Sequence, residues 1–251
     1  MVADDGGPHV RLGVAWALVL LAAGVLGTAG LAPLLAATAA LAAVETARSR
    51  AGRLRPAPLP AGIGAAVVVV AAAGGGLAVA AAAVLVAVAG PAWVVAERVS
   101  GRRPTGARAY APVPTAALAV VLGVPVACVV LVRSSSGATV IAVLLCCVLL
   151  FDASVFIVGT GAANGWEGPA AGNVTIVPLT VIVGSLLSPP FTGSSAWVLG
   201  GVAVVTLPMG GLVARRMLGD RPVATPALGR VDTMLVTGPA WAVAAALLHV
   251  H

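Results

Sequence analysis

Four acidic residues in the second half of this chain have the chemistry and placement to hold a divalent cation. They are Asp152, Glu167, Asp220 and Asp232. Asp152 is embedded between two apolar runs, so its carboxylate is predicted to lie within a helix. If that helix crosses a bilayer, the buried charge costs about 2.5–3.5 kcal/mol and should face a polar cavity or a partner. Asp232 has a second interpretation, as a cap for the helix that follows it.

Arginines accompany these carboxylates in the polar stretch before the last apolar run. They are Arg215, Arg216, Arg221 and Arg230. Carboxylate oxygens suit Mg²⁺, and the planar guanidinium suits phosphate oxygens. Together they fit a nucleotide-using site at one rim of the protein. Two further acidic residues, Glu45 and Glu97, stand beside other arginines and are interpreted as solvated charges at helix ends.

The elements that position these residues must be apolar helices. Hydrophobic residues make up 60% of the chain and charged residues only 9%, whereas a soluble domain has about a quarter of its residues charged. All fourteen basic residues are arginines, and their excess over the eight acidic residues gives a net charge of +6. Because these arginines sit in short loops between apolar runs, membrane topology explains them and no nucleic-acid partner is expected. The three cysteines lie in apolar runs and are interpreted as small buried side chains.

Apolar runs long enough to cross a bilayer recur along the chain. We therefore predict an all-α, polytopic integral membrane protein with about nine transmembrane helices. The expected spans are 12–28, 31–44, two within 61–95 divided at Gly74 to Gly76, 113–132, 138–158, 174–187, 196–213 and 234–250. We expect two regions, residues 1–135 with about five helices and residues 136–251 with the candidate site.

The arginines also predict an orientation. Clusters occur between the second and third, fourth and fifth, and eighth and ninth spans, and nine alternating crossings place all of them on one side. Positively charged loops of membrane proteins face the cytoplasm. The prediction is a multi-pass protein of the cell membrane whose N-terminus and loops with the candidate site motifs are cytoplasmic.

Three segments of the C-terminal half resemble motifs of one enzyme family. The run from Leu228 to Leu235, Leu-Gly-Arg-Val-Asp-Thr-Met-Leu, is followed by Pro239 and resembles the C-terminal signature of phosphatidate cytidylyltransferases. The segment from Phe151 to Gly159 is similar to an Asp-Thr-x-Ala-Tyr-x-x-Gly segment of that family. Gly165-Trp166-Glu167-Gly168, with Gly172, resembles its Glu-Gly loop. The resemblance covers roughly residues 140 to 251.

This resemblance implies transfer of a cytidylyl group from CTP to phosphatidate, an anionic phospholipid, with Mg²⁺ as cofactor. The products are CDP-diacylglycerol and pyrophosphate. By match to the motifs, Asp232 is the expected metal ligand, with Glu167 and Asp220, and Arg230 is a phosphate contact. Asp152 would line the polar cavity. Arg215 and Arg216 stand where the family has a Lys-Arg pair. A homodimer is also compatible with the sequence.

The chain also departs from the family pattern. Gly229 replaces the first Asp of the signature, and the Pro-Gly-His-Gly-Gly and Ser-Pro-Lys-Lys stretches are missing. Two alternatives therefore stay open. One is a member of the family that has lost catalysis and acts as a membrane partner or scaffold. The other is a small-solute transporter, which the many spans and the intramembrane Asp152 would suit.

Overall fold

The computed structural model describes residues 8–50, 55–99, 111–160, 162, 164–218 and 225–250. All regular secondary structure in these residues is helical. The elements are α1 (Pro8–Val25), α2 (Thr28–Ser49), α3 (Pro58–Ala71), η1 (Ala72–Gly74), α4 (Gly76–Val99), α5 (Pro112–Gly159), α6 (Glu167–Leu186), α7 (Gly193–Leu218), η2 (Leu228–Arg230) and α8 (Met234–Leu247). The predicted all-α class is therefore confirmed.

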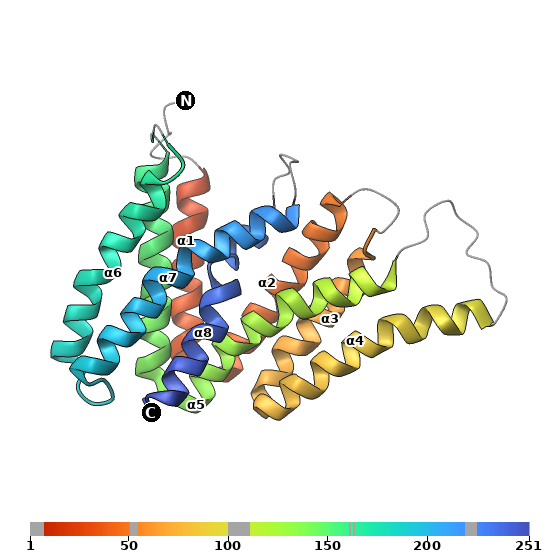
Figure 1. The fold of residues 1–251 in the computed structure, drawn as a ribbon, viewed down its shortest axis with the longest axis horizontal. Helices are drawn as coiled ribbons and strands as arrows, with labels where there is room; N and C mark the ends of the chain where they lie inside the picture. The colour runs from red at the N-terminus through yellow and green to blue at the C-terminus, as the bar shows by residue number, and fades with distance from the viewer. Residues whose placement is uncertain are drawn as a thin grey trace.

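Consecutive helices run in opposite directions, so the chain turns back and forth between two ends of the molecule (Figure 1). Gly27, Gly75 and Gly137 mark three of these turns, with φ angles of 82°, 90° and 87°. This left-handed backbone strains residues that carry a Cβ, which explains glycine at each turn. The long helix α5 is consequently two helical arms that meet at Gly137, close to the expected turn between the fifth and sixth spans.

Helix α5 is the centre of the packing, because it contacts every other α-helix of the described structure. One cluster of buried side chains runs through the bundle and joins the first helices to the last. Small residues let the helices approach closely. A Cβ at Gly238 of α8 would collide with the backbone carbonyl of Pro125 in α5, so glycine at this position sets the distance between the two helices.

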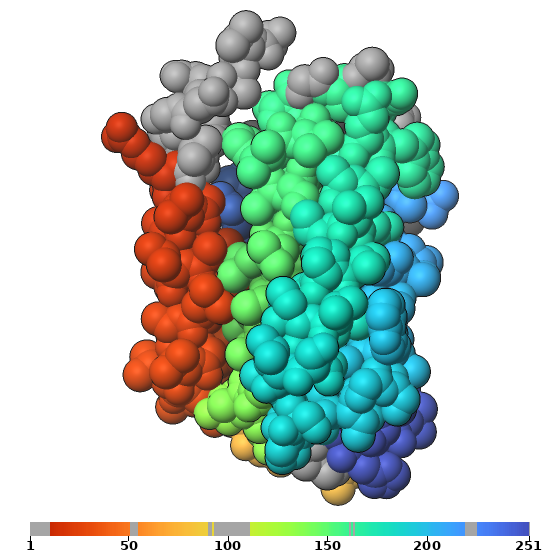
Figure 2. All heavy atoms as spheres, turned by 90° about the vertical axis from the view of Figure 1, so that its left-hand side faces the viewer, coloured from red at the N-terminus to blue at the C-terminus, as the bar shows by residue number. Residues whose placement is uncertain are grey.

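The outer surface of the bundle is apolar. Figure 2 shows α1, the second arm of α5 and α6 side by side on one face, and the exposed large side chains of α6 include Val174, Ile182 and Leu186. Four helices of the described residues are long and apolar enough to cross a membrane, namely Thr28–Ser49, Pro112–Gly159, Glu167–Leu186 and Gly193–Leu218. These features fit a membrane protein, and the count of nine crossings stays a prediction.

One boundary differs from the sequence-based expectation. Glu167 was expected in a loop ahead of the seventh span, but it is the first residue of α6. Pro169 is tolerated there because the first turn of a helix has no internal acceptors for its N–H groups. The expected division between residues 135 and 136 falls beside the Gly137 kink, and the separation into two regions stays a prediction.

Candidate site at one end of the bundle

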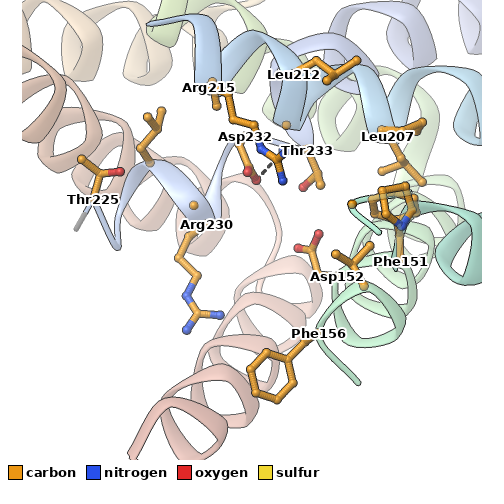
Figure 3. Close-up of a pocket in the computed structure, with 18 of the residues that line it drawn as sticks. Phe151, Asp152, Phe156, Leu207, Leu212, Arg215, Thr225, Arg230, Asp232 and Thr233 are labelled. Carbon is orange, nitrogen blue, oxygen red and sulfur yellow. Dashed lines mark hydrogen bonds between the residues drawn. The ribbon is translucent and has the colours of Figure 1, made fainter. Parts of the chain in front are cut away.

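A pocket of about 620 Å³ lies where α5, the start of α6, the end of α7 and η2 meet. Its polar lining includes Asp152, Arg215, Arg230, Asp232 and Thr233, and its apolar lining includes Phe151, Phe156, Trp166, Leu207, Leu212 and Leu218. Figure 3 shows the side chains of Asp152 and Asp232 on facing walls of this space. Residues far apart in the sequence therefore form one charged pocket with apolar walls.

Asp152 reaches the pocket from the second arm of α5. It stands seven residues before the helix ends at Gly159, which corresponds to about 10 Å of helix. Phe151, Val155 and Phe156 of the same helix line the pocket around it. Asp232 and Arg230 line the same pocket. The embedded carboxylate thus faces a polar cavity, as its position in the sequence predicts.

Asp232 lies in the turn between η2 and α8. Its Oδ1 accepts a hydrogen bond of 2.7 Å from the backbone N–H of Thr233. The N-cap residue of α8 is Thr233, and its side chain makes no capping hydrogen bond. Asp232 precedes the cap and accepts the N–H of the N-cap residue only. Burial raises the pKa of Asp232 to about 6, although the Thr233 N–H and the charges of Arg215 and Arg230 act in the opposite direction.

Two glycines of α7 let this turn approach the helix. A Cβ at Gly210 would collide with the Asp232 carbonyl oxygen and would stand 2.9 Å from the Cα of Thr233. At Gly211 it would stand 4.0 Å from Asp232 Oδ2. Sequence reasoning missed both residues. The pair of glycines one turn before Arg215 was the available signal, since small residues mark close contacts between helices.

Two arginine side chains line the pocket. Arg215 is in the last turn of α7 and is exposed. Arg230 is the last residue of η2, and its Nη1 would be 3.7 Å from a Cβ placed on Gly13 of α1. Within the described part of the chain, neither side chain makes a hydrogen bond or an ion pair. Both cations are therefore available to an anion.

Helix α2 and its C-cap residue form hydrogen bonds with the segments beside the pocket. The backbone N–H groups of Ala227 and Leu228 donate to Glu45 Oε2 at 2.9 and 3.3 Å. Arg50 Nε donates to the carbonyl oxygen of Met217 at 3.1 Å. Glu45 thus binds the start of the short helix that presents Arg230. Its interpretation as a solvated interfacial charge was wrong, because its partners are backbone groups about 180 positions away that no local pattern reveals.

The other expected site residues lie outside the pocket lining or outside the described residues. Glu167 begins α6 and does not line the pocket, whereas its neighbours Gly165, Trp166 and Pro169 do. Arg216 is exposed on α7 and is likewise absent from the lining. Asp220 and Arg221 lie outside the described residues. The structure therefore brings together Asp152, Asp232, Arg215 and Arg230 from the expected set.

No family model, curated protein or solved structure matches this chain.

The pocket residues are compatible with a Mg²⁺ ion that is also bound by a phosphate ligand. No group of three or more His, Cys, Asp or Glu side chains that could hold a metal occurs in the described residues. Mg²⁺, however, is usually bound by one or two carboxylates together with waters and substrate phosphates, and rarely by a complete protein cage. Asp152 and Asp232 supply two carboxylates, and the Thr233 hydroxyl beside them is buried without a partner. This donor set fits a magnesium ion that arrives with a phosphate ligand.

Proposed function

We propose that the protein is a membrane nucleotidyltransferase that resembles phosphatidate cytidylyltransferase and joins CTP to phosphatidate. One observation carries this proposal. Asp152 and Asp232, from two of the motifs that suggest the family, line one pocket with Arg215 and Arg230. The pocket combines acidic and basic groups with a large apolar wall, which suits a phosphate group attached to an acyl glycerol.

The proposed reaction is a displacement at phosphorus. An oxygen of the lipid phosphate bonds to the α-phosphorus of CTP, and the bond from that phosphorus to the oxygen of the departing pyrophosphate breaks. Arg215 and Arg230 would bind phosphate oxygens and stabilise the negative charge that develops. Phe156, Leu212 and Trp166 would contact the apolar part of the lipid. The chain itself thus supplies orientation and charge, the main requirements of such transfers.

Mg²⁺ would neutralise phosphate charge and polarise the reacting phosphorus when it is bound. Asp152 and Asp232 would hold it jointly with the substrate phosphates. Glu167 and Asp220 remain proposed ligands from the motif match, although Glu167 stands at the margin of the pocket. Because Asp232 has a pKa of about 6, it is mostly ionised at neutral pH and can act as a metal ligand there.

We further propose that the chain crosses the cell membrane nine times with this pocket at the cytoplasmic side. The direction reversal at Gly137 supports this count, because each arm of α5 is then about as long as the roughly 30 Å hydrocarbon core. The pocket lies at the same end of the bundle as the turn from α2, where Arg48 and Arg50 stand. The excess of arginine at that end supports a cytoplasmic position.

The proposal is tested with purified protein in liposomes that contain phosphatidate and magnesium. CTP labelled at the α-phosphorus should give labelled lipid, whereas CTP labelled at the γ-phosphorus should label only pyrophosphate. Asp232→Asn should lower the rate by about a hundredfold or more, because a preorganised charge contributes several kcal/mol in the transition state. Arg48→Gln, an exposed residue at the same end of the bundle and outside the pocket, should keep the wild-type rate. Label from the γ-phosphorus in lipid would contradict the proposal.

A non-catalytic member of the family is the second candidate. Gly229 stands where the family has an acidic residue, and no three-residue metal cluster occurs among the described residues. This candidate predicts phosphatidate binding that depends on Arg215 and Arg230 without any labelled lipid product.

A transporter would instead show solute flux that Asp152→Asn abolishes and that substitutions at Asp232 leave unchanged.

A further inference from the structure

Three polar atoms along α8 are buried without a hydrogen-bond partner in the described structure. They are Thr233 Oγ1, Thr237 Oγ1 and Trp241 Nε1. The exposed fractions of these side chains are 4%, 0% and 1%. Buried polar atoms are normally paired with protein groups or with ordered water. Three consecutive exceptions on one helix therefore indicate a ligand that supplies the missing partners.

The spacing of these side chains places them in a single row. Thr233 has helical backbone angles, with φ −60° and ψ −28°, so positions 233, 237 and 241 lie on one face of the helix. Four residues of helix rise about 6 Å. Two hydrogen bonds of about 2.8 Å each span nearly the same distance. One water molecule between successive side chains would thus satisfy both of them.

The residues at the two ends of the row each line a cavity. Thr233 lines the charged pocket of about 620 Å³, beside Asp232 (Figure 3). Trp241 lines a second, small cavity of about 10 Å³ together with Thr180, Cys147 and Phe191. A cavity of roughly 10–15 Å³ holds one water molecule and nothing larger. The Thr180 hydroxyl donates to the Ile176 carbonyl at 2.8 Å, so its oxygen keeps a free acceptor site.

We propose that a file of bound waters extends the charged pocket along the Thr233, Thr237 and Trp241 face of α8. The ligand is water, because the small cavity admits no larger molecule and the indole N–H requires an acceptor. The file ends beside Trp241. The next residue on that face, Ala245, is fully buried and apolar. The feature is therefore a closed, hydrated inlet from the pocket into the bundle, and it does not cross the protein.

The inlet is tested with a protein in which Trp241 is the only tryptophan, after replacement of Trp16, Trp93, Trp166 and Trp197 by phenylalanine. Fluorescence of an indole that is hydrogen-bonded to water increases in D₂O, so the Trp241 emission should increase. Thr237→Val keeps the side-chain shape but removes the hydroxyl. We expect it to shift the emission to shorter wavelength and to remove most of the D₂O effect.

Two further variants separate hydration from a general change in packing. Thr237→Ser keeps a hydroxyl and should retain the D₂O effect. Thr206→Val on α7 removes a buried hydroxyl that already donates to the Val202 carbonyl, so Trp241 emission should not change. Thr237→Val should also lower the melting temperature, whereas a dry, unpartnered hydroxyl would make this variant more stable. The proposal is overturned if D₂O leaves the emission unchanged or if Thr237→Val raises the melting temperature.

Discussion

Glu45 accepts a hydrogen bond of 2.9 Å from the backbone N–H of Ala227, 182 positions further along the chain. The same oxygen accepts a second bond from Leu228 at 3.3 Å. These N–H groups begin the short helix η2, which ends at Arg230 and is followed by Asp232. A side chain of the second helix therefore fixes the segment that carries two of the pocket's charged groups.

We predict that Glu45→Ala destabilises the protein by about 1–3 kcal/mol, because two partly buried backbone donors lose their acceptor. Glu45→Gln keeps an acceptor oxygen and should be milder. Thermal unfolding in detergent measures the effect, and the rate of lipid labelling should fall in the same order. Arg48→Ala is the control, since Arg48 is exposed on the same helix. Equal melting temperatures for Glu45→Ala and the wild type would show that this contact does not hold η2.

Gly210 should be intolerant of a side chain. A Cβ there would collide with the Asp232 carbonyl group, so we predict that Gly210→Ala costs about 1–3 kcal/mol through overpacking and lowers turnover. Gly201→Ala is the matched control on the same helix, because a Cβ at Gly201 meets nothing within 4 Å. The control should be neutral or slightly stabilising, since alanine favours helix over glycine. Similar stability of the two variants would contradict the close contact between α7 and Asp232.

Stability should depend on pH through Asp232. Its folded pKa of about 6 exceeds the usual 3.8, so near pH 5 the folded protein holds a proton that the unfolded chain has released. Protonation of Asp232 therefore favours the folded state at low pH. Its contribution to the free energy of unfolding is at most about 3 kcal/mol and is lost as pH rises from about 4 through 6.

Asp232→Asn provides the reference for this prediction, because asparagine does not titrate. We expect wild type and variant to have similar melting temperatures near pH 4 and the wild type to melt lower near pH 7. Melting curves across that range measure the difference. A difference that stays constant with pH would mean that Asp232 has an ordinary pKa.

The pocket arginines should bind phosphate. We predict that Arg215→Gln and Arg230→Gln each weaken pyrophosphate binding by about ten- to a hundredfold, because a hydrogen bond to a charged group contributes about 1.5–3 kcal/mol. Isothermal titration calorimetry on the detergent-solubilised protein measures the affinity. Arg48→Gln should bind as the wild type does. Uniform weakening by all three substitutions would indicate a general effect of net charge and no specific site.

The helices were predictable from sequence because apolar runs of bilayer length leave few alternatives. The turns at Gly75 and Gly137 were predictable for a similar reason, since glycine is the residue suited to their backbone angles. The shared pocket of Asp152 and Asp232 followed from their expected position at one end of neighbouring helices. Glu45 and Gly210 were not predictable, because their roles depend on contacts between distant segments that leave no local pattern.

The central claim is that Asp152 and Asp232 act as one site for cytidylyl transfer. The most direct measurement is the rate of lipid labelling from α-labelled CTP for the wild type, Asp152→Asn, Asp232→Asn and the double variant. Groups that act as a unit are not additive. We predict that the wild type labels lipid, that each single variant loses about a hundredfold or more, and that the double variant is no worse. Absence of labelling by the wild type, or losses that multiply in the double variant, would contradict the claim.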